Sequence, residues 1–405
     1  MKKLQILFLF LSVSAIVGFK CTKKTYKNSE NKIVTGAEQT EKYLNLLKGK
    51  RVGVLANPTT VIGKSHLVDS LQKLGINIGK VFGPEHGFRG NASNGAKVND
   101  EVDEATGIKI ISLYGKKRKP TPEDLADVDI MIFDIQDVGC RFYTYINVLR
   151  DVMESCAENQ KTLLILDRPN PNGYLIDGPI MDMRLKSGIG QFPIPIAHGM
   201  TIGEFAQMIN GEGWLPNNLQ CSLNIIKVLN YKHDMEYTLP VKPSPNLNTQ
   251  QSVMLYPTIC MFEGTIISQG RGTYVPFTVL GSPLLKGKYE FTFKPESIKG
   301  MSESPLHINE TCYGLDLMQY DIEKLRKSKR LNLQWMIDLY KAYPQKDKFF
   351  DRTQSKQMGN IDYLAGVYEF RKQIEEGKNA EEIQKSWEPG LSEYKKMRMK
   401  YVLYE

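Results

Sequence analysis

The most concentrated group of reactive side chains lies in residues 83–90, with the sequence GPEHGFRG. Its glycines permit tight turns and let a ligand approach the backbone closely. Glu85, His86 and Arg89 could together supply a proton donor, the group that orients it and a clamp for an anion. The alternative is a surface loop held together by salt bridges.

A second segment, residues 134–145 with the sequence DIQDVGCRFYTY, combines carboxylates, an arginine and aromatic rings. Asp134 and Asp137 could accept hydrogen bonds from sugar hydroxyls, or one could act as a second catalytic carboxylate. Arg141 could bind one of these carboxylates or an acidic substrate. A purely structural ion pair between Asp137 and Arg141 is the competing interpretation.

A third segment places Glu263 beside a glycine and Arg271 between two glycines, in the stretches FEGT and SQGRGT. Such a loop could fold over a ligand, although Glu263 could equally be a buried structural acid. His198, at the end of an apolar run, could act as a base or be a structural residue held by hydrogen bonds.

The sequence lacks the motifs that are typical of several other kinds of catalytic or cofactor site. Gly63-Lys64-Ser65 ends like a phosphate-binding loop, but Pro58 occupies the position of its first glycine. The sequence has no G-x-G-x-x-G, H-E-x-x-H or G-x-S-x-G, so we expect no nucleotide cofactor, no metal and no serine nucleophile. Carboxylates, arginines and aromatic residues remain, and glycoside hydrolysis is the reaction that most naturally uses them.

The elements that position these residues alternate between short apolar runs and helical patterns, which predicts βαβ units and a parallel sheet. Five polar motifs each follow an apolar run, at the sheet edge where ligands bind in open α/β folds. The motifs begin at Asn57, Gly83, Asp134, Asp167 and His198. The runs cover residues 51–56, 80–82, 109–113, 129–133, 162–166 and 194–197, and helices are expected at 65–74 and 145–158.

After Gly211 the pattern changes to an alternating run at 222–228, a loop-rich stretch at 240–281 and helices near 333–340 and 361–376. We therefore predict two domains: a Rossmann-like catalytic domain over 41–214 and a smaller α+β domain over 215–405 that closes the cleft. T-x-x-E at Thr201 and N-x-x-E at Asn379 predict capping boxes at two helix starts. The second of these helices is expected to reach Trp387.

The N-terminus predicts export. Lys2 and Lys3 precede an apolar run over residues 4–19, the length of a signal-peptide core. Residues 1–21 are read as the signal peptide, 22–40 as a linker, and Cys21 as a lipid-acceptor cysteine, with plain secretion as the alternative. We expect a periplasmic or outer-membrane lipoprotein that meets the membrane only through this anchor.

The distribution of charge argues against a nucleic-acid partner, and the spacing of the cysteines indicates that they are free thiols. Seven lysines and one glutamate before residue 35 account for most of the net charge of +8. The remainder of the chain has no basic footprint for nucleic acid. The five cysteines after Cys21 are scattered without C-x-x-C pairs, so we expect buried free thiols.

The motifs in this order resemble the NamZ-type exo-β-N-acetylmuramidases, glycoside hydrolase family 171, once called domain of unknown function 1343. The resemblance covers nearly the whole chain after the linker. It implies an exo-acting enzyme that removes N-acetylmuramic acid from the non-reducing ends of peptidoglycan fragments. It is carried by FGPEHGFRG, DIQDVGCRFYTY, LDRPNPNG, PIPIAHGMTIGE, PSPNL, YPTICMFEGT and GRGT.

The resemblance implies that Glu85 is the leading catalytic candidate, with His86 beside it, and that Glu263 and Asp137 compete for the second role. One departure is Gln269, where some members carry glutamate. Muramyl saccharides carry a lactyl carboxylate, and we expect Arg271 or Arg141 to bind it. The full set of expected substrate-binding residues is Asn57, Arg89, Asp134, Arg141, Tyr143, Arg168, Asn170, His198, Asn246 and Arg271.

Two other functions fit the same residues. A non-catalytic lipoprotein that binds muropeptides would retain the arginines and aromatic rings and would tolerate loss of the Glu85 carboxylate. A different carbohydrate hydrolase on the same scaffold is the other.

Overall fold

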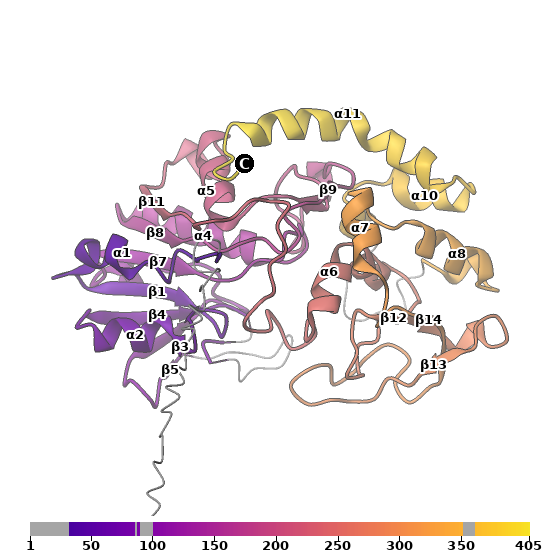
Figure 1. Cartoon of the computed structure of the whole chain (residues 1–405), viewed down its shortest axis with the longest axis horizontal. Helices are drawn as coiled ribbons and strands as arrows, with labels where there is room; N and C mark the ends of the chain where they lie inside the picture. Colours follow the sequence, from indigo (N-terminus) through magenta and orange to yellow (C-terminus); the bar gives the residue numbers. More distant parts are fainter. Residues whose placement is uncertain (1–31, 86, 90–99, 351–360) are drawn as a thin grey trace, which may run out of the picture. The chain divides into compact units, whose positions relative to one another are not determined.

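A seven-stranded, mostly parallel sheet forms the first part of the structure (Figure 1). The computed structural model describes residues 32–85, 87–89, 100–350 and 361–405. The strand order is β11-β8-β7-β1-β4-β6-β5, and only the edge strand β5 runs antiparallel to its neighbour. The strands are β1 (Val52–Ala56), β4 (Ile78–Gly83), β5 (Glu101–Val102), β6 (Lys109–Ser112), β7 (Ile130–Asp134), β8 (Thr162–Leu166) and β11 (Leu223–Ile226).

The central strands are buried on both faces, which explains why they appear in the sequence as continuous apolar runs. Alternate residues of one strand face opposite sides. In β1, Val52 and Val54 pack in one core cluster and Leu55 in another. Helices cover both faces: α1 (Thr40–Leu47), α2 (Leu67–Lys73), α3 (Pro122–Leu125), α4 (Tyr145–Glu158) and α5 (Ile202–Gly211). The predicted α/β class is confirmed.

Two predicted strands have different partners from those expected. The run at 194–197 yields only β10 (Ala197–His198), which pairs with β9 (Ile176–Asp177) outside the large sheet. The run at 222–228 becomes β11 and extends the large sheet beside β8. A domain boundary at residue 214 would therefore separate β11 from its sheet.

The second part is built from helices around a three-stranded antiparallel sheet, in the order β12-β14-β13. The strands are β12 (Val279–Ser282), β13 (Phe291–Phe293) and β14 (Cys312–Asp316); a small hairpin in the first part joins β2 (Val61–Ile62) to β3 (Ser65–His66). The helices are α6 (Gln250–Ile259), α7 (Ile322–Ser328), α8 (Gln334–Ala342), α9 (Ile361–Ala365), α10 (Glu369–Glu375) and α11 (Ala380–Met399).

The helix starts were predicted better than the helix lengths. Both capping boxes form, at Thr201 with Glu204 and at Asn379 with Glu382. The helix expected over 361–376 is interrupted at Gly366, whose φ of +80° is left-handed. The last helix continues beyond Trp387 to Met399.

Membrane spans and disulfides are absent from the ranges that the structure describes. No helix there is long and apolar enough to cross a bilayer. Cys140, Cys156, Cys221, Cys260 and Cys312 are buried and form no disulfide.

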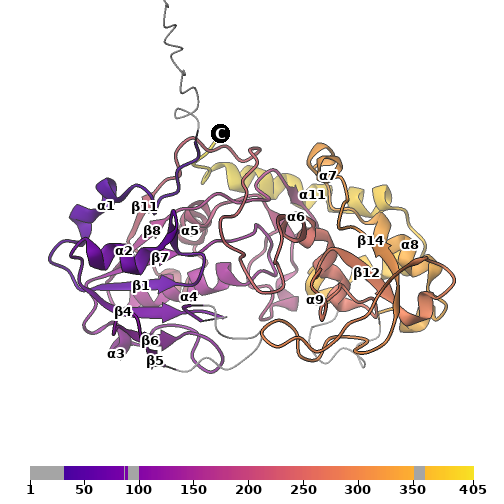
Figure 2. The same cartoon turned by 60° about the horizontal axis from the view of Figure 1, so that its bottom comes forward.

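The C-terminal segment returns to the large sheet. In Figure 1 α11 runs from the neighbourhood of α10 to that of α5, and Figure 2 shows the C-terminus on the same side of the molecule as β11 and α5. Beyond it, the backbone N–H of Leu403 donates to Glu204 of α5 at 2.8 Å, and the Tyr404 hydroxyl donates to Asp167 at 2.5 Å. Burial raises the pKa of the Asp167 carboxyl to about 6, although hydrogen bonds from Tyr404 and Thr201 oppose this rise.

We expect Tyr404→Phe to lower the free energy of unfolding by about 1 to 3 kcal/mol, because the Asp167 carboxylate and the Val228 N–H each lose a buried partner. Because the pKa of Asp167 is raised from 3.8 to about 6, its ionisation lowers the free energy of unfolding progressively between these two pH values. The Tyr404 hydroxyl stabilises the ionised form of Asp167. The loss of free energy of unfolding in Tyr404→Phe should therefore be larger at pH 8 than at pH 5. Urea denaturation at both pH values measures it.

Tyr401→Phe is the matched control, because its hydroxyl donates to the more accessible Glu212 at 2.7 Å. Equal losses in the two variants, or no dependence on pH, would contradict the role given to Tyr404.

Candidate active site

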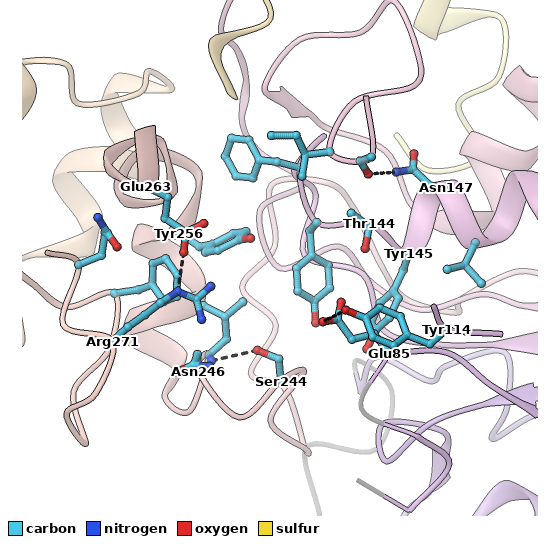
Figure 3. Close-up of a pocket in the computed structure, with 18 of the residues that line it drawn as sticks. Glu85, Tyr114, Thr144, Tyr145, Asn147, Ser244, Asn246, Tyr256, Glu263 and Arg271 are labelled. Atoms are coloured by element: carbon cyan, nitrogen blue, oxygen red, sulfur yellow. Dashed lines mark hydrogen bonds and ion pairs between the residues drawn. The ribbon is translucent and has the colours of Figure 1, made fainter. Parts of the chain in front are cut away.

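One cavity of about 760 Å³ lies between the carboxyl-end loops of the large sheet and the second part of the chain. Glu85, Tyr114 and Tyr145 lie on one side, and Glu263 and Arg271 lie on the other (Figure 3). The volume falls within the range of small-molecule sites, of about 300 to 1,000 Å³.

Glu85 follows β4 directly, so the sheet places its carboxylate at the edge where ligands bind in α/β folds. The hydroxyl of Tyr114, which follows β6, donates to Glu85 Oε1 at 3.0 Å. Burial first, and then the negative charge of Glu85, raise the pKa of Tyr114 to about 12. Tyr114 therefore remains a hydrogen-bond donor at neutral pH and fixes the orientation of the carboxylate.

Tyr145 stands beside Glu85 at the start of α4. Its hydroxyl oxygen accepts a hydrogen bond from Asn57 Nδ2 at 2.9 Å. Burial, followed by the charge of Glu85, raises the pKa of Tyr145 above its usual range. The hydrogen bond from Asn57 therefore fixes the position of the Tyr145 hydroxyl in the wall of the cavity.

On the opposite side, Arg271 Nε donates to Glu263 Oε1 at 2.5 Å. Burial opposes the charge of the guanidinium, but the Glu263 carboxylate outweighs it and raises the pKa of Arg271. Gly270 and Gly272 have φ values of +76° and +80°, a backbone that favours glycine and that explains the G-R-G sequence. Glu263 lies in a 3-10 turn over Cys260–Gly264 directly after α6.

The structure brings together only part of the predicted set. Glu85, Tyr143, Asn246, Glu263 and Arg271 line the cavity. His86 lies outside the described residues. The others are not among the lining residues: Asn57, Arg89, Asp134, Asp137, Arg141, Arg168, Asn170 and His198.

The prediction that Arg141 contacts substrate is corrected by its burial. Its guanidinium is fully buried and donates to the backbone carbonyls of Ile194 and Leu364, each at 2.8 Å, and to that of Pro179 at 3.3 Å. Burial lowers its pKa to about 9. Arg141 therefore links the segments at Pro179 and Ile194 to helix α9.

The predicted pair of Asp137 with Arg141 is also absent from the ion pairs of the described residues. Asp137 Oδ2 instead accepts from the backbone N–H of Gly139 at 2.6 Å and lies 3.5 Å from His198 Nε2. His198 Nδ1 in turn accepts from the backbone N–H of Met200 at 3.3 Å. Both side chains are buried, so the structure supports the structural interpretation of His198.

The remaining predicted polar residues have structural partners. Arg168 pairs with Asp134 through two hydrogen bonds, the longer being 2.8 Å, and both side chains are buried. Arg89 binds Asp69 and Asp103, as the salt-bridged alternative predicted. Asn170 donates to the Met200 carbonyl at 3.0 Å, while Asn57 supports Tyr145 from behind.

Sequence reasoning missed several residues of the cavity, including Tyr114, Tyr145, Asn147, Ser244 and Tyr256. A signal existed for Tyr114, because it follows the apolar run 109–113 at the same sheet edge as Glu85. No group of three His, Cys, Asp or Glu side chains able to hold a metal ion occurs within the described ranges.

Comparison with known proteins agrees with the sequence resemblance. Residues 52–251 match the family described as exo-beta-N-acetylmuramidase NamZ, N-terminal, and residues 254–404 match its C-terminal counterpart. The chain is 38% identical to the peptidoglycan beta-N-acetylmuramidase NamZ of Bacillus subtilis (strain 168), over 98% of this chain and 99% of that protein.

Two crystal structures of DUF1343 family proteins from Bacteroides fragilis NCTC 9343 are also similar. The first, at 1.30 Å resolution, is 43% identical with a TM-score of 0.84, and the match covers 92% of this chain and 99% of that one. The second, at 1.65 Å, is 30% identical with a TM-score of 0.79, over 93% and 100% of the two chains. Matches of this length and identity show that the chain belongs to the NamZ family of exo-β-N-acetylmuramidases.

Proposed function

We propose that this protein is an exo-acting glycoside hydrolase that releases N-acetylmuramic acid from the non-reducing ends of peptidoglycan fragments. The observation that carries the proposal is the match to the Bacillus subtilis peptidoglycan beta-N-acetylmuramidase along nearly the full length of both chains. A cavity with a glutamate on each side fits this reaction, which needs a proton donor and usually a second group.

In the proposed mechanism Glu85 donates a proton to the oxygen of the breaking glycosidic bond. Its Oε1 is held by Tyr114, which leaves the carboxyl group fixed in direction as the leaving group departs. Glu263 faces the same cavity from the opposite side. It either attacks the anomeric carbon directly or activates a water molecule that attacks it. Its ion pair with Arg271 fixes the position of the Glu263 side chain.

The test is release of para-nitrophenol from the β-N-acetylmuraminide, compared with the β-N-acetylglucosaminide, together with product analysis on unlabelled muramyl-terminated chains. We expect turnover of the muraminide and free N-acetylmuramic acid as the product. Release of internal fragments would contradict exo action, and turnover of the glucosaminide alone would replace the proposed substrate.

Glu263→Gln and Asp137→Asn separate the two candidates for the second role. We expect Glu263→Gln to lower kcat/KM by about 100-fold or more. Asp137→Asn should mainly lower the free energy of unfolding, by about 1 kcal/mol, because Asp137 is buried away from the cavity. Steady-state kinetics and urea denaturation of both variants check this. The reverse pattern would transfer the second role to Asp137.

The proposed site of action is outside the cytoplasm. Lys2, Lys3 and the apolar run at 4–19 support export, and Cys21 supports a lipid anchor. The intact mass of the membrane-associated protein would reveal lipidation. Cys21→Ser should release the protein into the soluble fraction, and retention on the membrane would contradict the anchor.

A further inference from the structure

A muramic acid residue differs from glucosamine by an ether-linked lactyl group that carries a carboxylate. An enzyme that selects this sugar needs a cation or several hydrogen-bond donors where that carboxylate lies. Among the described residues that line the cavity, Arg118 and Arg271 are the two with cationic side chains. The choice of recognition group therefore falls between them.

Arg118 and Arg271 differ in exposure and fixation. Arg118 is exposed at the edge of the cavity, whereas the Arg271 side chain retains only 17% of its accessible surface. Arg271 is fixed by Glu263 and by the ring of Phe277, whose centroid lies 4.9 Å from the guanidinium carbon. A fixed, desolvated guanidinium discriminates between ligands more strongly than a solvated one, because it loses less entropy on binding and is less screened by water.

The ion pair with Glu263 uses only one edge of the Arg271 guanidinium. Nε makes the hydrogen bond, while Nη1 is buried and has no hydrogen-bond partner among the described residues. The terminal nitrogens point towards the interior of the cavity in Figure 3. A buried charged donor without a partner is costly, so this edge is suited to a ligand carboxylate, which two parallel N–H groups can hold.

Resting on the proposed function, we propose that Arg271 is the specificity-determining residue of this cavity and that its terminal nitrogens bind the lactyl carboxylate of the muramyl substrate. One guanidinium then holds two carboxylates, Glu263 through Nε and the substrate through the Nη edge. Recognition of the sugar is thereby linked to the position of Glu263, because a single planar group orients both.

The experiment compares three para-nitrophenyl β-glycosides: the muraminide, its lactyl methyl ester and the glucosaminide. The wild-type protein should prefer the free acid to the ester in kcat/KM by about 10-fold to 100-fold, the value of a charge-assisted hydrogen bond. In Arg271→Lys and Arg271→Gln this preference should shrink to within a few-fold. Arg118→Ala is the matched control and should retain the wild-type ratio, whatever its effect on each rate.

Equal losses for acid and ester in the Arg271 variants would overturn the proposal, as would loss of the preference in Arg118→Ala. Calorimetric titration with free N-acetylmuramic acid and N-acetylglucosamine gives a readout that does not need turnover. If the wild type cleaves none of the glycosides yet binds muramic acid more tightly through Arg271, the hydrolase proposal fails and the assignment of Arg271 stands.

Discussion

Glu85→Gln is expected to lower kcat/KM on muramyl substrates by about 100-fold to 10,000-fold, the contribution of one general acid. Glutamine keeps the size of the side chain and an oxygen that can accept from Tyr114, so the fold should be unchanged. The measurement is hydrolysis of the para-nitrophenyl muraminide and of a natural disaccharide by wild type and variant. Urea denaturation checks the folding of both.

The comparison of leaving groups identifies the role of Glu85. Para-nitrophenolate departs with little protonation, whereas a sugar oxygen needs a proton, so a general acid should matter more for the disaccharide. Equal losses on both substrates would point to a nucleophilic or positioning role. Tyr114→Phe is the matched control, since it removes one hydrogen bond to Glu85 and should cost less activity than Glu85→Gln. Unchanged activity in Glu85→Gln would exclude Glu85 as the general acid, whereas no turnover by the wild type would favour the muropeptide-binding alternative.

Asp134→Ala and Arg168→Ala are each expected to lower the free energy of unfolding by about 3 to 5 kcal/mol, because each leaves an unpaired charge in the interior. Both side chains are almost inaccessible, with exposures of 0% and 2%. Burial raises the pKa of Asp134 despite the nearby guanidinium, as expected for a carboxylate without access to water. Urea denaturation of the two variants measures the loss.

The Asp134→Ala/Arg168→Met double variant should be less destabilised than the sum of the single changes, because it removes both charges together. Arg51→Ala is the control on the surface, since its pair with Asp129 is exposed and should matter little. If Asp134→Ala raised KM without affecting stability, the original prediction of a substrate contact would be restored.

The sequence predicted local structure well, since local structure depends on neighbouring residues. The runs at 129–133 and 162–166 became β7 and β8, and the capping boxes at Thr201 and Asn379 formed, because a continuous apolar run and a capping spacing are both patterns of neighbouring residues. Glu85 was placed correctly in the cavity because it follows an apolar run, at the carboxyl edge of the sheet where ligands bind. The partner of β11 depended on the whole sheet, and the sequence alone could not supply it.

The arginines show where sequence reasoning stopped. Arg141 and Arg271 both lie in motifs of the family, yet one is buried against carbonyl groups and the other faces the cavity. What separates them is contact with residues far away in the chain, such as Leu364, 223 positions after Arg141. Residue type and spacing contain no information about such contacts.

The attachment of the last residues to the large sheet also has a consequence for biosynthesis. Asp167, which directly follows β8, lies 237 positions before Tyr404. Strand β8 therefore leaves the ribosome long before the Tyr404 hydroxyl that donates to Asp167. Arg398 and Tyr394 likewise reach back to the carbonyls of Gly199 and His198. The first domain therefore completes its interior only after residues 394–404 have been synthesised, and until then its nascent chain exposes surface that the finished fold covers.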